Sequence, residues 1–294
     1  MGKGEYAMAV QIGRKLAEGG CAEVFEWEEG KIVKLAKPNT NEWALQRELN
    51  HCRIAKSCGL PVPDVYGLVH WNGRPGIVFE LVEGESLMTR FVDRAVSALH
   101  PEAAASGGNY DYLGAGITAK LLHQVHQQSG AGMPEQRENL VYDIRRTSYL
   151  SEHEHDAIIG YLERLPAKKQ LCHGDPNPGN IMLRHDDAWL IDWNNASVGN
   201  PEADLAEYIL MIRYAILPSH LPKELNAVLD AARESAIQRF IEEYESLSGI
   251  GYAEIEPWLP VIAARKLCAD AISEEEKEFL IREARSIFHN TSHA

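Results

Sequence analysis

The 294-residue sequence predicts an α+β fold in which a small antiparallel sheet precedes a larger, mostly helical part. Short segments of alternating polarity, separated by glycine-containing turns, fill roughly the first 80 residues. From Ser86 onward the segments are long and have a helical pattern. The charge divides similarly: the first 80 residues hold ten basic and ten acidic residues, so the remainder carries the whole net charge of −14.

The first part contains a glycine turn between its first two strands. Strands are expected over residues 11–16, 23–27, 31–35, 65–70 and 76–82, with one helix over residues 42–49. Gly19 and Gly20 lie in the first turn, where backbone N–H groups without a neighbouring Cβ can approach phosphate oxygens. Ala17 and Ala22 occupy the outer positions of a G-x-G-x-x-G pattern, so an ordinary hairpin turn remains the alternative.

The second part holds the expected helices and two histidine pairs. Helices are expected over residues 86–96, 113–128, 151–165, 222–247, 252–271 and 273–288. His123 and His126 have a spacing that could serve a metal, but no third ligand follows at a suitable distance, so a packing role is favoured. His153 and His155 form the second pair. Ser151 and Glu154 beside them form a capping box for the following helix, which explains this polar segment better than a metal site does.

The candidate catalytic and metal-binding residues are concentrated between Leu171 and Trp193. His173-Gly174-Asp175 is followed by Asn180 and then by Asp192. Phosphoryl transfer from a nucleotide needs one carboxylate to accept the proton of the attacking hydroxyl, and an amide and a second carboxylate to hold Mg²⁺. Asp175 is therefore the candidate base, and Asn180 and Asp192 are the candidate metal ligands. For the tripeptide alone a tight loop is the favoured interpretation, but the joint spacing of all three residues favours the chemical interpretation.

A short hairpin is expected to bring the two metal ligands together. Residues 181–183 and 188–191 are apolar and flank the polar turn 184–187. Asn180 precedes the first strand and Asp192 follows the second. Pairing of the two strands would place both side chains at the same end of the hairpin.

This stretch, together with Asp204-Leu205-Ala206 beyond it, resembles the aminoglycoside phosphotransferase and choline kinase family of small-molecule kinases. The resemblance implies a bilobal protein-kinase-like fold with ATP or GTP bound between the lobes. The implied N-terminal nucleotide-binding lobe covers residues 1–83, and the C-terminal catalytic and acceptor-binding lobe covers residues 84–294. In such a fold Asp204 begins a helix and braces the catalytic loop.

The resemblance also implies the nucleotide contacts of the first lobe. Lys34 would hold the α- and β-phosphates and pair with Glu48, with Glu42 as the weaker alternative partner. The Gly19-Gly20 loop would cover the phosphates. The backbone carbonyl of Glu80 and the N–H of Val82 would contact the adenine base.

Family members build their acceptor pocket from the C-terminal helices. Glu254, Glu256 and Trp258 fall in that region of the chain. A core or surface position is the favoured interpretation for all three, and a contact with the acceptor is the alternative.

Composition limits the partners. The acidic charge argues against nucleic acid or an anionic membrane as a partner, and no apolar run reaches the about 18 residues of a membrane helix. Five cysteines without a CxxC pair, after an N-terminus without a signal-peptide pattern, favour a cytoplasmic protein. The acidic second part favours a cationic acceptor, with solvated helix faces as the alternative. The sequence does not determine the oligomeric state.

The expected function is Mg²⁺-dependent transfer of the γ-phosphate of ATP, or of GTP, to a hydroxyl of a small molecule. No Ala-Pro-Glu segment follows Asp192, which argues against a protein kinase. A protein kinase and a catalytically silent nucleotide-binding module remain the alternatives. Aminoglycosides, amino alcohols, sugars and amino acids all remain open as acceptors.

Overall fold

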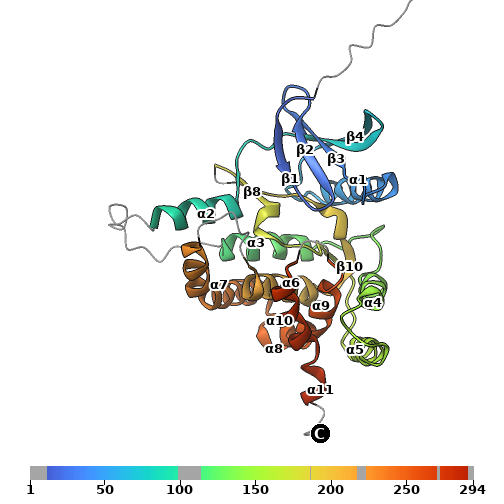
Figure 1. The fold of residues 1–294 in the computed structure, drawn as a ribbon, viewed down its shortest axis with the longest axis vertical. Helices are drawn as coiled ribbons and strands as arrows, with labels where there is room; N and C mark the ends of the chain where they lie inside the picture. The colour runs from blue at the N-terminus through green and yellow to red at the C-terminus, as the bar shows by residue number, and fades with distance from the viewer. Residues whose placement is uncertain (1–11, 99–113, 186, 217–222, 270–271, 291–294) are drawn as a thin grey trace, which may run out of the picture.

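A five-stranded antiparallel sheet with one long helix forms the first part of the protein (Figure 1). The computed structural model describes residues 12–98, 114–185, 187–216, 223–269 and 272–290. The sheet order is β1-β2-β3-β5-β4. Its strands are β1 (Lys15–Glu18), β2 (Ala22–Glu26), β3 (Lys31–Ala36), β4 (Val65–Trp71) and β5 (Arg74–Glu80), and the helix is α1 (Glu42–Ser57).

The alternation of side chains along β3 decides what faces the helix. Val33 and Leu35 are fully buried on one face of the sheet. Ile32 and Ala36 belong to the other face, which packs against the apolar side of α1. Because successive side chains of a strand point to opposite faces, Lys34 lies on the α1 face. The N-terminus of α1 is fixed by Asn41, whose side chain accepts a hydrogen bond from the N–H of Ala44.

Helices make up most of the second part, which lies below the sheet in Figure 1. They are α2 (Leu87–Ala98), α3 (Ala115–His126), α4 (Gln136–Arg146), α5 (Glu152–Arg164), α6 (Pro201–Tyr214), α7 (Glu224–Ser248), α8 (Tyr252–Ile255), α9 (Leu259–Lys266), α10 (Glu274–Ala284) and α11 (Ile287–Asn290). Short 3-10 turns are η1 (Pro178–Asn180), η2 (Trp193–Asn195) and η3 (Glu256–Trp258). Among the described residues, no helix is both long and apolar enough to cross a membrane.

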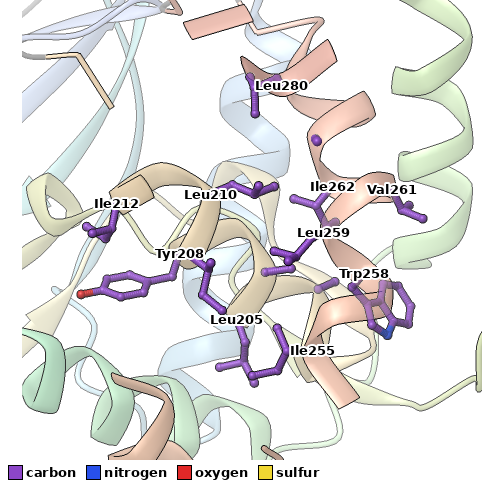
Figure 2. Packing of buried hydrophobic residues seen from close by; sticks show 14 of the residues in the cluster. Leu205, Tyr208, Leu210, Ile212, Ile255, Trp258, Leu259, Val261, Ile262 and Leu280 are labelled. Carbon is purple, nitrogen blue, oxygen red and sulfur yellow. The ribbon is translucent and has the colours of Figure 1, made fainter. Parts of the chain in front are cut away.

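The core of the second part forms where α6 and α9 meet. Figure 2 shows Leu210 of α6 beside Ile262 of α9, while the ring of Tyr208 points away from α9. Helix α6 is buried on nearly every side, which is why its sequence has no polar stripe. Residues 171–193 therefore lie against a helix that is buried over most of its length.

Small strand pairs connect this core to the segment between Leu171 and Trp193. The hairpin of β8 (Ile181–Arg184) and β9 (Asp187–Leu190) pairs with β6 (Glu85–Ser86), and β7 (Gln170–Cys172) pairs with β10 (Ser197–Gly199). The boundary predicted at residues 83/84 falls in the segment between β5 and β6. Gly84 is needed there, because a Cβ at this position would lie 2.0 Å from the carbonyl oxygen of Leu183.

Several local elements differ from those expected from the sequence. Helix α4 and the β7–β10 pair were not expected from the sequence, and the first strand lies over Lys15–Glu18 instead of residues 11–16. The continuous helix expected over residues 252–271 is wrong, since the chain forms α8, η3 and α9 in succession. Pro257 and Pro260 explain the breaks, because each lies in the first turn of a new element and lacks the N–H that a continuing helix requires.

Candidate active site

The loop after β7 is held by Asp204, from the first turn of α6. The N–H groups of His173 and Gly174 donate to the two carboxylate oxygens of Asp204, at 2.6 and 2.9 Å. Gly174 has φ +79°, and a Cβ there would lie 2.4 Å from the carbonyl oxygen of Asn195. The bracing contact expected of Asp204 is therefore present, and it depends on a glycine.

His126 completes the buried support of this loop. Its Nε2 lies 3.3 Å from the carboxylate of Asp204 and its Nδ1 lies 2.7 Å from the Tyr244 hydroxyl. Ligand atoms of His126, Cys172 and Asp204 lie within 4.8 Å of one another. Burial raises the pKa of the Cys172 thiol well above its usual range, which favours the neutral thiol over the thiolate. The packing role favoured for His126 agrees with these contacts.

Asp175 is positioned by Asn180. The amide nitrogen of Asn180 donates to the Asp175 carboxylate at 3.0 Å and to the Asp175 carbonyl at 3.1 Å. These bonds use the nitrogen of Asn180 and leave its amide oxygen for another partner. Burial, with the nearby Glu207 carboxylate, raises the pKa of Asp175 above its ordinary value. A more basic carboxylate is a better proton acceptor.

The β8–β9 hairpin brings Asn180 and Asp192 to the same end, as its register requires. Ile181 pairs with Leu190, and the Ile191 N–H donates to the carbonyl oxygen of Asn180 at 2.9 Å. Asp192 then turns sharply, with φ 62° and ψ 65°. A left-handed conformation is uncommon for a residue with a side chain and costs about 1–3 kcal/mol, so surrounding contacts must hold it.

Lys34 links the two parts of the protein. Its Nζ lies 2.7 Å from Oε1 of Glu48 on α1 and 3.1 Å from Oδ1 of Asp192. Burial lowers the pKa of Lys34, but the two carboxylates outweigh this effect and raise it, so Lys34 is charged. For Asp192 the ammonium outweighs the effect of burial and lowers the pKa. The ion pair expected with Glu48 is present, whereas Glu42 lies 3.4 Å from His70 instead.

The loop after Asp192 is attached to α1 as well. Nδ1 of His51 lies 2.9 Å from the carbonyl oxygen of Trp193, and the guanidinium of Arg47 donates to Oδ1 of Asn194 at 3.1 Å. Trp193 is fully buried and packs edge-on against His173. Helix α1 therefore fixes both Lys34 and the residues that follow Asp192.

The Gly19-Gly20 turn is exposed and loosely packed. The Gly19 N–H donates to the Ala22 carbonyl at 2.9 Å, and Asn39 donates to the Gly20 carbonyl at 3.2 Å. A Cβ on Gly20 would meet no atom within 4 Å, and neither glycine has a positive φ. Packing alone does not require glycine at these two positions.

The connecting segment after β5 contains bonded and unbonded backbone N–H groups among the described residues. Glu80 ends the strand, and its N–H donates to the carbonyl oxygen of Asp64 at 2.8 Å. The Leu81 N–H donates to the carbonyl oxygen of Gly30 at 2.8 Å. Val82 is buried, and no group in the described part of the chain accepts a hydrogen bond from its N–H.

A buried cluster of charged residues that was not expected from the sequence lies beside Asp175. Lys266 Nζ lies 2.5 Å from Glu207 Oε1, and Arg265 Nη1 lies 3.3 Å from Glu207 Oε2. Arg265 also lies 3.6 Å from Asp143 of α4. Two features of the sequence could have indicated this cluster. Glu207 is one helical turn after Asp204, and Arg265 and Lys266 interrupt an otherwise apolar segment.

Glu254, Glu256 and Trp258, which were considered as contacts for the acceptor, lie in the core or on the surface. Trp258 is 2% exposed and belongs to the helical core, as Figure 2 shows. The side chain of Glu254 accepts a hydrogen bond from the Gly251 N–H at 3.0 Å, and Glu256 is on the surface. The favoured interpretation, core or surface, is confirmed.

An antiparallel sheet with a Lys–Glu pair, joined to a helical part that carries the Asp175 loop and Asp192, is the architecture of a kinase-like phosphotransferase. The family comparison agrees, because residues 14–258 match the model of the Phosphotransferase enzyme family. The chain therefore belongs to this family, and the resemblance seen in the sequence is confirmed.

Solved structures share the fold. Aminoglycoside phosphotransferase APH(2'')-Ib with bound ADP is 16% identical, with a TM-score of 0.54 and 94% of each chain covered. APH(4)-Ia is 15% identical, with a TM-score of 0.60 and coverage of 97% of this chain and 94% of that one. Amicoumacin kinase hAmiN, in complex with AMP-PNP, Ca²⁺ and Ami, is 15% identical, with a TM-score of 0.59 and coverage of 96% and 89%. These matches confirm the bilobal protein-kinase-like α+β fold, while no curated protein sequence matches significantly.

Proposed function

We propose that this protein is a Mg²⁺-dependent kinase that transfers the γ-phosphate of ATP, or of GTP, to a hydroxyl group of a small molecule. One observation carries the proposal: Lys34 contacts both Glu48, at 2.7 Å, and Asp192, at 3.1 Å. These three charges come from a strand, a helix and the end of a distant hairpin. A phosphate-binding lysine beside a metal-binding aspartate is what nucleotide phosphoryl transfer requires.

The first part of the chain would bind the nucleotide. Lys34 would hold the α- and β-phosphates while Glu48 keeps its ammonium in place. The open space around Gly19 and Gly20 allows phosphate oxygens to approach their backbone. The free N–H of Val82 suits an adenine nitrogen, and the carbonyl of Glu80 would accept from the adenine amino group.

The donor set at the end of the hairpin suits Mg²⁺. Asn180 has an amide oxygen that its bonds to Asp175 do not use, and the lowered pKa of Asp192 keeps that carboxylate ionised. Such oxygen donors are what this ion prefers. When bound, Mg²⁺ would neutralise charge on the nucleotide phosphates.

Asp175 would act as the base. Asn180 fixes one carboxylate oxygen, and the raised pKa of Asp175 makes it a better acceptor for the hydroxyl proton. The acceptor oxygen forms a bond to the γ-phosphorus, the bond from that phosphorus to the departing ADP breaks, and the hydroxyl proton passes to Asp175. Positioning and electrostatics supply most of the rate enhancement.

The test is ADP release by the purified protein with and without Mg²⁺, across aminoglycosides, amino alcohols, sugars and amino acids. Asp175→Asn should bind Mg·ATP about as well as the natural protein and lose turnover by roughly three powers of ten, because only the proton acceptor is removed. Asp187→Asn, on the exposed end of the same hairpin, is the control. Full turnover in Asp175→Asn would refute the assignment of the base.

A further inference from the structure

A cavity of about 190 Å³ lies beside the catalytic loop. Gly174, the neighbour of Asp175, forms part of its wall, together with Pro134, residues 194–197 and side chains of α1, α4, α6 and α9. Three arginines from three of these helices line it: Arg47, Arg146 and Arg265. Asp175 itself is outside the wall, but the wall residues Glu207 and Arg265 lie close enough to interact with its charge, so the cavity is the candidate site for the part of an acceptor that does not react.

The carboxylates of this cavity are already neutralised. Glu207 contacts both Lys266 and Arg265, and Asp143 contacts Arg265. Asp204 accepts the two N–H groups of the catalytic loop and is 1% exposed. A cationic acceptor would have to compete with these bonds for any carboxylate of the wall.

The charge of two of the three arginines, Arg47 and Arg146, is not balanced by an ion pair within the described residues. In the parts of the chain that the structure describes, neither Arg47 nor Arg146 forms an ion pair with a carboxylate. The Nε of Arg47 is buried without an acceptor, although its Nη2 donates to Asn194. An unsatisfied buried donor of a charged group is costly, and an anionic group bound in the cavity would supply the missing acceptor.

Aromatic rings accompany both arginines. The guanidinium of Arg47 lies 5.1 Å from the ring centre of Trp43, and that of Arg146 lies 5.2 Å from the ring centre of Tyr142. Each pair is spaced by four residues on its own helix. Tyr142 lines the cavity and is 62% exposed, so its ring can pack against the carbon skeleton of a ligand, whereas Trp43 lies outside the wall and supports Arg47.

We infer that the acceptor carries an anionic group, a carboxylate or a phosphate, that binds Arg47 and Arg146 while its hydroxyl faces Asp175. A planar guanidinium matches both groups with paired hydrogen bonds. The inference rests on the proposed phosphoryl transfer. The expectation of a cationic acceptor rests on overall charge alone, and a zwitterion satisfies both the acidic lobe and these arginines.

The experiment compares matched acceptors. Homoserine and gluconate provide the anionic members, 4-amino-1-butanol and glucose their counterparts without the carboxylate, and choline and kanamycin the cations. ADP release is measured for the natural protein and for Arg47→Gln, Arg146→Gln and Arg146→Lys. Arg145→Gln is the control, because Arg145 pairs with Asp156 at 2.6 Å and is absent from the cavity wall.

The anionic compounds should be preferred over their matched counterparts. Each Gln variant should lower kcat/KM for them by about 10- to 100-fold through KM, since one charge-assisted contact is lost. In Arg146→Gln the turnover of the neutral sugar should stay unchanged, because Arg146 has no contact with the loop after Asp192 among the described residues. Arg146→Lys should recover part of the loss, and Arg145→Gln should lose nothing. Equal or better turnover of the compounds without a carboxylate, unaffected by the Gln variants, would overturn the inference.

Calorimetric binding to the protein with and without Mg·ADP separates the two proposals. If Mg·ATP does not bind, the proposed function fails, while binding of the anionic compounds still reports the charge that the cavity accepts. If Mg·ATP binds and none of the anionic compounds does, the inference about the acceptor is wrong and the kinase proposal stands.

Discussion

Replacing Asp204 by Asn should loosen the catalytic loop without changing the shape of the side chain. Asp204 accepts hydrogen bonds from the His173 and Gly174 N–H groups at 2.6 and 2.9 Å and is 1% exposed. In the variant the amide oxygen can keep one of these bonds. The amide nitrogen faces the other N–H, so a buried donor loses its acceptor.

The magnitude follows from these contacts. An unsatisfied buried donor costs about 1–3 kcal/mol, and the remaining bond loses its charge assistance, worth about another 1 kcal/mol. The expected loss is therefore about 2–4 kcal/mol of unfolding free energy, out of the roughly 5–15 kcal/mol of a typical domain. Asp175 follows the two unsupported residues, so kcat should fall at temperatures where the protein is still folded.

Urea unfolding followed by circular dichroism measures the first effect, and ADP release measures the second. Asp156→Asn is the matched control, because that side chain is 67% exposed and its ion pair with Arg145 is worth at most about 1 kcal/mol. A loss below about 0.5 kcal/mol in Asp204→Asn, with unchanged kcat, would refute the idea that Asp204 supports the loop.

Two further predictions concern the same loop. Gly174→Ala should lower the unfolding free energy by at least about 1–3 kcal/mol, because Gly174 has φ +79° and a Cβ would lie 2.4 Å from the carbonyl oxygen of Asn195. Unfolding in urea measures this loss, and an unchanged urea midpoint would contradict the prediction. The pKa of Asp175 is raised by burial, so kcat/KM should fall about tenfold per pH unit below that raised pKa, as the base becomes protonated. A pH profile between about pH 4 and 8 tests this, with folding checked at each pH, and an acidic limb at the ordinary pKa of aspartate would count against it.

The sequence contained enough local information for the catalytic stretch. The two strands around residues 184–187 are short, apolar and joined by a polar turn, so their pairing followed from spacing alone. The Lys34–Glu48 pair also came from the sequence, but only through resemblance to a family. Alternation along β3 puts Lys34 on one face, and nothing in that pattern says which helix covers the face.

Helix α4 shows why other elements escaped prediction. Leu140 and Ile144 are one turn apart and buried, but the surrounding residues are charged and the apolar stripe is narrow. The helix is stabilised by packing between α5 and the core, and such contacts cannot be seen in a short window. The cavity proposed for the acceptor is lined in part by this helix, so the sequence alone could not place that cavity.

By itself, then, the sequence determined the fold class and the residues that lie within one hairpin of each other, because strand pairing and turn chemistry act over short distances. Tertiary structure alone decided which charges are compensated. Arg265 looks like Arg146 in the sequence, yet Glu207 and Asp143 surround only the first of them. Coulomb interactions depend on distance in space, and these partners lie on helices far apart along the chain.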